Sequence, residues 1–329
     1  MAATEISADE MQRVFDEVKT PFKYGVVLRP PTDKTYYDCP SVFRHKGRWY
    51  MLFASTSDKV GYETELAVSD NLLDWEVLGK TLPFAKETWD CWQADGGLAL
   101  IDYQWGGSLE LQQYDDKYWM SYLGGALQGY ETDPLSIGIA YTETPDQPKP
   151  WTRLPNNPVL KPSDPDVRPF EAKTLYKSNI IWDKQQRLGA PFVMYYNGKQ
   201  VGRGWERIGM ATSHDMRTWK RFGDGPVIDN ITGISGDPQI AQIGDLFVMF
   251  YFGHVWKPKA FDTFAVSRDL IHWTKWDGQH LVEPSEPFDQ TFAHKPWVIK
   301  HDGVVYHYYC AVGTEGRLIA LATSRDLRK

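Results

Sequence analysis

Three short motifs in this sequence place chargeable side chains beside a proline: Asp38-Cys39-Pro40, Asp237-Pro238 and His294-Lys295-Pro296. A fourth segment carries a lone carboxyl group, that of Glu171. Carboxyl and imidazole groups that share a pocket shift one another's pKa values, which keeps acid and base roles distinct. Two carboxyl groups facing one pocket can protonate a leaving oxygen and activate water or attack carbon, which is the chemistry of glycosidic bond cleavage.

A repeated phrase indicates how these motifs are brought together. An apolar residue, an alanine and a serine or threonine recur five times, in four cases with a tryptophan downstream. The alanines of the phrase are Ala67, Ala140, Ala211, Ala265 and Ala322. A recurrence on this scale is typical of an array of supersecondary units that bury their faces against each other.

The segments around each phrase predict the fold. An aromatic-rich strand, large on both faces, precedes every phrase, and such a strand must be covered on both faces. Turn signals such as His45-Lys46-Gly47 and a further short strand precede it, and most phrases are followed by an outer strand. Four strands in each of five units predict an all-β fold, a five-bladed β-propeller.

The N-terminal residues predict an arm and a closing strand. Residues 24–29 read as an orphan outer strand that completes the last blade and closes the ring. Residues 6–18 predict a helix, with Ser7 and Glu10 as a capping box and an apolar stripe of Met11, Val14, Phe15 and Val18. We expect a helical arm over 1–23, packed on the propeller or on a second subunit, and a catalytic propeller domain over 24–329.

The inner strands of a propeller begin around one central pocket, which selects the candidate site. Asp38, Asp237, His294 and Lys295 belong to neighbouring blades and are expected to face one cavity, with Glu171 opposite Asp38. Long insertions over 83–107 and 161–177 are further places where function tends to lie. The predicted catalytic residues are Asp38, Glu171, His294 and Asp237. The predicted substrate-binding residues are Trp92, Asp95, Lys177, Lys295 and Trp297.

Structural roles compete with these assignments. An aspartate before a proline is often a turn residue, Glu171 could lie in solvent, and Trp92 could pack in a core. The serine, aspartate and tryptophan of the phrases read as structural turns and anchors. Glu63 and Glu131, in repeated Gly-Tyr-Glu-Thr segments, read as surface-loop residues.

Composition excludes several classes of partner. The 329 residues carry a net charge of −7 without a block of lysine and arginine, so nucleic acid and membrane are not expected partners. No secretory signal is evident, so we expect a cytoplasmic protein, or a secreted or periplasmic one from which a signal has been removed. The three cysteines have no metal-ligand spacing. No cofactor is expected to be required, although a divalent cation such as calcium is compatible with the sequence.

The phrase from Arg207 to Trp219 resembles the blade phrase of the five-bladed propeller glycosidases, which include glycoside hydrolase families 43, 62, 32, 68, 117 and 130. The resemblance to family 43 implies that Asp38 is the general base, Glu171 the general acid and Asp95 a carboxyl that tunes the acid. The resemblance to family 117 implies instead that His294 is the acid and that the helix at 6–18 supports a homodimer.

The sequence therefore predicts a glycosidase with an inverting mechanism, in which Asp38 activates water and Glu171 or His294 protonates the leaving group. Asp237 and Asp95 are expected to bind sugar hydroxyls or tune pKa values, and Trp92 and Trp297 to stack on sugar rings. Lys295, Lys173 and Arg168 are candidates for binding an anionic sugar. The alternatives are a carbohydrate-binding propeller without catalysis and a phosphorylase or transferase on the same fold.

Overall fold

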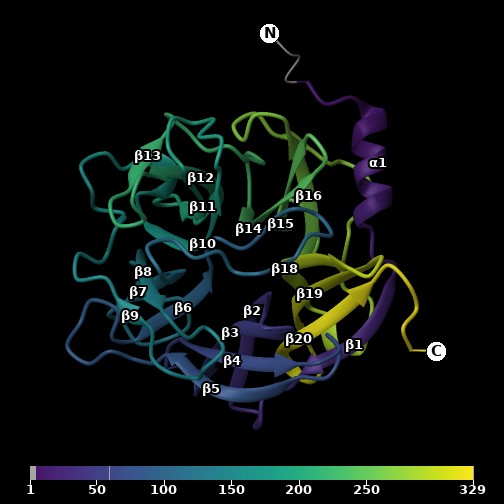
Figure 1. The fold of residues 1–329 in the computed structure, drawn as a ribbon, viewed down its shortest axis with the longest axis horizontal. Coiled ribbons are helices and arrows are strands. Elements are labelled where there is room, and N and C mark those ends of the chain that lie inside the picture. Colours follow the sequence, from purple (N-terminus) through teal and green to yellow (C-terminus); the bar gives the residue numbers. More distant parts are fainter. Residues whose placement is uncertain (1–4, 59, 329) are drawn as a thin grey trace.

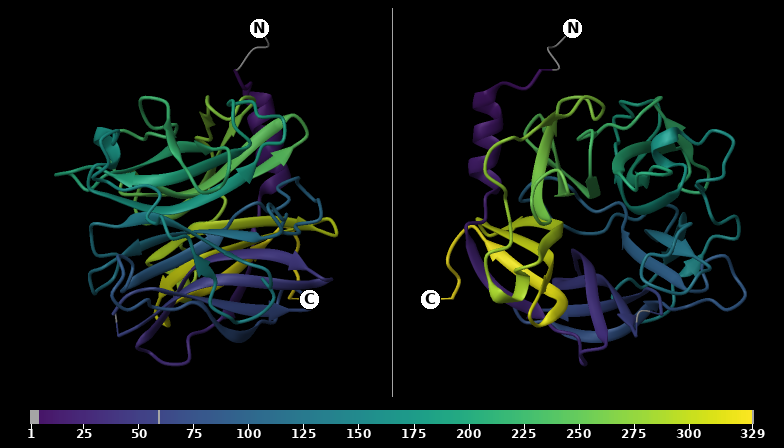
Figure 2. Two further views of the ribbon diagram at one scale, coloured as in Figure 1. Left: turned by 60° about the vertical axis from the view of Figure 1, so that its left-hand side comes forward. Right: turned by 180° about the vertical axis from the view of Figure 1, so that it is seen from behind.

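The computed structural model describes residues 5–58 and 60–328. Within that part of the chain one α-helix, α1 (Ala8–Val18), accompanies strands that pair mainly with their neighbours in sequence. Figures 1 and 2 show these strands in groups arranged around a common centre. No helix among the described residues has the length and apolar character needed to cross a membrane.

Each group contains an inner strand followed by antiparallel strands that lead outward. Two groups form separate four-stranded sheets: β2 (Thr35–His45), β3 (Arg48–Ser57), β4 (Glu63–Ser69) and β5 (Glu76–Leu82), then β6 (Gln93–Leu98), β7 (Tyr118–Gly125), β8 (Ser136–Thr142) and β9 (Thr152–Arg153). A third sheet holds β18 (Phe292–His301), β19 (Val304–Gly313), β20 (Gly316–Thr323) and β1 (Phe22–Leu28).

The remaining strands form one eight-stranded sheet made of two such groups. They are β10 (Thr174–Trp182), β11 (Phe192–Lys199), β12 (Glu206–Ser213) and β13 (Lys220–Phe222), then β14 (Ile234–Ile243), β15 (Leu246–His254), β16 (Phe261–Ser267) and β17 (Thr274–Lys275). A single parallel pair, Glu206 with Ile234, joins the two groups. Short 3-10 helices, η1 (Pro169–Glu171) and η2 (Pro287–Asp289), precede β10 and β18.

The repeated phrase is a structural turn, as predicted. In β4, β12 and β16 the serine that ends the strand accepts hydrogen bonds from backbone N–H groups two and three residues later, as Ser213 Oγ does from Asp215 and Met216. Such bonds between a side chain and the backbone favour a turn over continuation of the strand. The phrase therefore holds each group together and contributes nothing to the cavity described below.

Both N-terminal elements form where the sequence places them. Strand β1 pairs antiparallel with β20, and α1 begins with the predicted capping box of Ser7 and Glu10. The apolar stripe of α1 packs against β15 and β16 of the same chain, and Phe15 stacks on Trp276 at 5.0 Å between ring centroids. Residues 1–4 of the predicted arm lie outside the described residues.

Inner strands β2, β14 and β18 share a strained bulge just before their proline. The register with the next strand slips there, and Cys39, Asp237 and Lys295 take positive φ angles of 50°, 51° and 62°. Non-glycine residues rarely adopt this left-handed conformation, which tends to cluster at functional sites. Because the bulge turns each strand locally, it re-aims the side chains toward the centre of the molecule.

The long insertion does not lie where the sequence suggested. Strand β6 takes up Gln93–Leu98, and the extra residues, 99–117, follow it before β7 begins. This segment pairs with the later halves of inner strands: Ala99 with Ile180, Gln104 with Gln242, and Glu110 with Arg44. It therefore crosses the ends of the inner strands that lie opposite the bulges of the three proline motifs, in the middle of the ring in Figure 2.

Candidate active site

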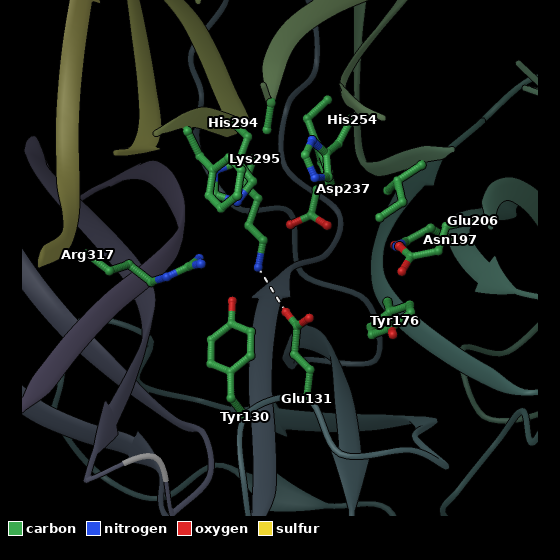
Figure 3. Close-up of a pocket in the computed structure, with 14 residues that line it drawn as sticks. Tyr130, Glu131, Tyr176, Asn197, Glu206, Asp237, His254, His294, Lys295 and Arg317 are labelled. Carbon is green, nitrogen blue, oxygen red and sulfur yellow. Dashed lines mark hydrogen bonds and ion pairs between the residues drawn. The ribbon is translucent and has the colours of Figure 1, made fainter. Parts of the chain in front are cut away.

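A cavity of about 150 Å³ opens at the beginnings of the inner strands (Figure 3). Three carboxyl side chains line it, together with two cations, a histidine pair and aromatic rings. The carboxyls are Glu131, Glu206 and Asp237; the other polar and aromatic residues are Tyr130, Tyr176, Asn197, Phe252, His254, Phe292, His294, Lys295 and Arg317. Of the predicted site residues, Asp237, His294 and Lys295 therefore reach this cavity.

Asp38 lies behind the cavity wall, at its centre of charge. The side chain is fully buried, and its Oδ2 accepts hydrogen bonds from Arg317 at 2.7 Å, Lys295 at 3.0 Å and Tyr130 at 3.0 Å. Burial alone would raise the pKa of Asp38, but Lys295 and then Arg317 hold it well below its usual range. The carboxylate is thus ionised and saturated with donors, an arrangement that fixes the two cations in place.

Lys295 links Asp38 to the first carboxyl of the cavity. Its ammonium lies 3.0 Å from Glu131 Oε1, the contact marked in Figure 3, and Tyr62 also donates to that oxygen at 3.3 Å. The Glu131 side chain is one-quarter exposed, since it faces the cavity. The expectation that Glu131 lies in a surface loop is therefore wrong. Glu63 of the equivalent segment instead pairs with Lys80 on the surface.

Glu206, the first residue of β12, carries the second carboxyl. Asn197 Nδ2 donates to its Oε2 at 3.0 Å, and no cation among the described residues pairs with it. Burial, and then the charge of nearby Glu131, raise the pKa of Glu206 to about 8. Glu206 therefore holds a proton at neutral pH, and its Oε1 has no hydrogen-bond partner in the described part of the chain.

Asp237 and His294 complete the titratable groups of the cavity. Burial raises the pKa of Asp237 to about 6, although Lys295 and Lys177 partly oppose this. His294 Nδ1 lies 3.1 Å from the carbonyl oxygen of Cys310. Burial, with the charges of Arg317 and Lys295, holds the pKa of His294 well below its usual value. Its imidazole is neutral and has no spare proton to give at neutral pH.

Glu171 does not lie among the residues that line the cavity. It is fully buried under η1, where its Oε1 accepts hydrogen bonds from Arg168 at 2.9 Å and Arg221 at 2.8 Å, and its Oε2 accepts one from Tyr196 at 2.6 Å. Burial works to raise the pKa of Glu171, but the bonds and charge of Arg168 outweigh it and lower the pKa. A carboxylate held in this way is a structural anchor with no proton to transfer.

Asp95 and Lys177 pair with each other below the cavity. Lys177 Nζ donates to Asp95 Oδ1 at 3.1 Å, to the carbonyl of Cys39 at 3.0 Å and to that of Gly96 at 3.2 Å. The burial that raises the pKa of Asp95 is partly offset by Lys177. Both side chains are almost fully buried and join β2, β6 and β10 at the axis.

The two predicted stacking residues are not cavity residues. Trp297 is 5% exposed and its indole N–H donates to the carbonyl of Val42 at 2.9 Å, so it packs in the core. Trp92 packs edge-on against Phe84, with ring centroids 5.4 Å apart. Neither indole face is offered to a sugar in the cavity.

The cations considered for an anionic sugar already have partners. Lys295 pairs with Asp38 and Glu131, Lys173 with Asp133 at 3.0 Å, and Arg168 with Glu171. Within the cavity, Lys295 and Arg317 are matched by Asp38 and Glu131. As far as the described residues go, the site offers no uncompensated positive charge to a carboxylate or phosphate.

Comparison with known proteins now identifies the group to which the molecule is related. A solved structure named as a BT0996 complex with RGII is 44% identical in sequence, covers 98% of this chain and 97% of its own, and superposes with a TM-score of 0.94. A structure named Glycoside hydrolase is also 44% identical, covers 98% and 96%, and has a TM-score of 0.93. A thermostable family-43 glycoside hydrolase, 16% identical over 87% of this chain and 89% of its own, shares the fold with a TM-score of 0.59.

Sequence comparison reaches less far. No protein-family model matches the chain. Uncharacterized protein Rv1502 of Mycobacterium tuberculosis (strain ATCC 25618 / H37Rv) is 28% identical over 177 residues, and the match covers 50% of this chain and 58% of that protein. The chain thus matches little more than half the length of this curated relative. By its 44% identity to a solved glycoside hydrolase over nearly the whole of both molecules, the protein belongs to the glycoside hydrolases and has their propeller fold.

Proposed function

We propose that this protein hydrolyses a glycosidic bond in the central cavity, with Glu206 as the proton donor and Glu131 as its partner carboxylate. The observation that carries the proposal is the pair itself. The two carboxyls line one cavity, and their surroundings differ: Glu206 has an amide and a pKa of about 8, whereas Glu131 has a lysine ammonium. Pairs of carboxyls whose environments separate their protonation states are how glycosidases assign acid and base.

The roles follow from what each group holds at neutral pH. Protonated Glu206 gives its proton to the leaving glycosidic oxygen as the bond to the anomeric carbon breaks. Ionised Glu131 takes a proton from the water that attacks the same carbon. Asp38 acts one layer behind, because it keeps Lys295 and Arg317 in position without touching the substrate. This replaces the predicted pairing of Asp38 with Glu171 or His294.

The cavity favours an uncharged sugar. Its two cations are balanced by Asp38 and Glu131, and its aromatic side chains (Tyr130, Tyr176, Phe252 and Phe292) suit the apolar faces of a sugar ring. A volume of about 150 Å³ is below the roughly 300–1,000 Å³ of pockets that hold drug-sized ligands, so one terminal sugar of an oligosaccharide fits best. Because a similar protein is named for a complex with RGII, we propose an oligosaccharide from RGII as the first substrate to test.

The remaining features of the proposal concern the whole molecule. We infer five blades, two of them in the eight-stranded sheet, with β1 closing the ring as the outer strand of the β18–β20 group. Residues 1–23 would form an arm on a catalytic domain of residues 24–329. A homodimer through α1 stays a prediction, which light scattering tests.

No metal is needed for this proposal. Lys177 places an ammonium among three oxygen acceptors at the axis, where it supplies a positive charge. Within the described residues there is no group of three or more histidine, cysteine, aspartate or glutamate side chains that could hold a metal ion. We therefore expect hydrolysis to be unchanged by a chelator, and a loss restored by calcium would contradict this.

The experiment is a hydrolysis assay on oligosaccharides from RGII and on a panel of neutral and uronic-acid aryl glycosides. We expect release of one neutral sugar from the end of an oligosaccharide, and loss of that activity in Glu206→Gln and in Glu131→Gln. Proton NMR of the first-formed product tests the inverting course predicted from the sequence, because retention would instead make Glu131 a nucleophile. Full activity in either variant would overturn the assignment.

A further inference from the structure

The insertion over 99–117 has no part in the cavity, yet it is the longest departure from the repeat. It runs across the far ends of the inner strands, where Gln104 pairs with Gln242 of β14 and Trp105 N–H donates to the Gln242 carbonyl at 2.9 Å. On the same strand, Ile234 and Asp237 line the cavity. The insertion therefore builds the opposite face of the molecule.

A groove of about 290 Å³ lies on that face. Its lining includes Tyr103, Gln104 and Gln112 from the insertion, Trp182 and Arg187 from the end of β10 and the loop after it, and Gln242. Along β10, Trp182 lies six positions beyond Tyr176, which lines the cavity. At about 3.3 Å per residue the two hollows are roughly 20 Å apart along the strand.

The groove presents neutral hydrogen-bonding groups that the protein leaves unused. Gln112 Oε1 is buried without a partner, and neither the Tyr103 hydroxyl nor the Trp182 indole N–H bonds to any described residue. Leaving a buried acceptor unpaired costs about 1–3 kcal/mol, which a ligand hydroxyl would relieve. Gln104 Nε2 donates to Gln242 Oε1 at 2.8 Å, which aligns a pair of amides along the wall.

Charge in the groove is balanced, as it is in the cavity. Arg187 pairs with Asp183, and Lys184 lies 4.8 Å from the centre of the Trp182 ring. Amides, hydroxyls and aromatic edges without net charge recognise a polyhydroxylated, uncharged ligand. Nucleic acid or an acidic peptide would need unpaired cations here.

We propose that this groove is an accessory binding site for a neutral oligosaccharide segment. The ligand class rests on the proposed function, since the groove would hold the same polysaccharide whose terminal sugar enters the cavity. Because the two sites lie on opposite faces, the groove does not extend the cavity. It keeps the enzyme on the polymer and raises the effective concentration of chain ends.

The test combines Tyr103→Phe with Gln104→Ala, two changes that remove groove groups and leave the cavity intact. Gln279→Ala, which alters an exposed glutamine elsewhere, is the matched control. Isothermal titration with the RGII polysaccharide, in a Glu206→Gln background that prevents turnover, should show a loss of affinity of at least about fivefold in the groove variant. With Glu206 intact, kcat/KM should fall on the polymer and stay unchanged on a cleaved aryl glycoside.

The outcomes separate this inference from the proposed function. Groove-dependent binding without hydrolysis of any substrate would sink the proposed function alone. Hydrolysis with unchanged polymer affinity in the groove variant, or no polymer binding by either protein, would overturn the accessory site.

Discussion

Glu171 and Glu206 are two buried glutamates in the β10–β13 group, and their surroundings could hardly differ more. Glu171 is fully buried and bonded by two arginines and a tyrosine, so its pKa falls below its usual value. Glu206 is 8% exposed and has one amide donor and a neighbouring carboxyl, so its pKa rises to about 8. Burial is common to both, and in both it acts to raise the pKa.

The difference shows that the partners of a buried carboxyl decide its role. A carboxylate that two guanidinium groups surround stays charged, and its removal would leave those cations unpaired. A carboxyl that faces an amide and another acid stays protonated and can give the proton away. The first holds the structure together, and the second is suited to chemistry.

The largest expected effect comes from Glu206→Gln, which removes the proton donor but keeps the amide contact with Asn197. We expect kcat/KM on a natural linkage to fall by about 10²–10⁴-fold, the usual contribution of general acid catalysis. A glycoside with a nitrophenol leaving group should lose much less, because nitrophenolate departs without a proton. Equal losses on both substrates would argue against an acid role.

Glu171→Gln tests the other side of the comparison. The variant leaves Arg168 and Arg221 without their counter-charge, so we expect the free energy of unfolding to fall by about 3–5 kcal/mol. Urea denaturation measures it, and the activity of the remaining folded protein should persist. Asp70→Asn, which breaks an exposed ion pair with Arg48, is the control and should cost no more than about 1 kcal/mol. Loss of turnover in folded Glu171→Gln would restore it as a catalytic candidate.

The repeat made much of the fold predictable, because it marks each group of strands and the apolar stripe of α1 marks the helix. The proline motifs also led to Asp237, His294 and Lys295, whose shared bulge turns them toward the cavity. Proline at a strand start is a local signal, and local signals survive folding.

Glu131 and Glu206 could not be chosen from the sequence in the same way. Glu131 sits in the same Gly-Tyr-Glu-Thr segment as Glu63, yet only Glu131 meets Lys295, which lies 164 residues away. Glu171 looked like the acid because its arginine partner Arg221 is 50 residues distant and invisible locally. Which carboxyl is neutralised by a distant cation is decided by tertiary packing alone.

The dependence of activity on pH provides a smaller but sharper test. Since the pKa of Glu206 is raised to about 8, the acid form is present below that pH and is lost as pH rises through it. We therefore expect kcat/KM to fall on an alkaline limb centred near pH 8. The measurement is the initial rate at low substrate concentration across the pH range. A limb near the usual glutamate value would show that another group donates the proton.

The smallest effect should come from Asn197→Ala. Asn197 Nδ2 donates to Glu206 Oε2 and so favours the charged form of the glutamate, which lowers its pKa slightly. Without this bond the pKa of Glu206 should rise, and the alkaline limb should move to higher pH by less than about one unit, equivalent to about 1.4 kcal/mol. Asn156→Ala, at an exposed amide far from the cavity, should leave the limb in place. A shift to lower pH in Asn197→Ala would mean that the amide instead accepts the glutamate's proton, and that Asn197 stabilises the acid form it was expected to weaken.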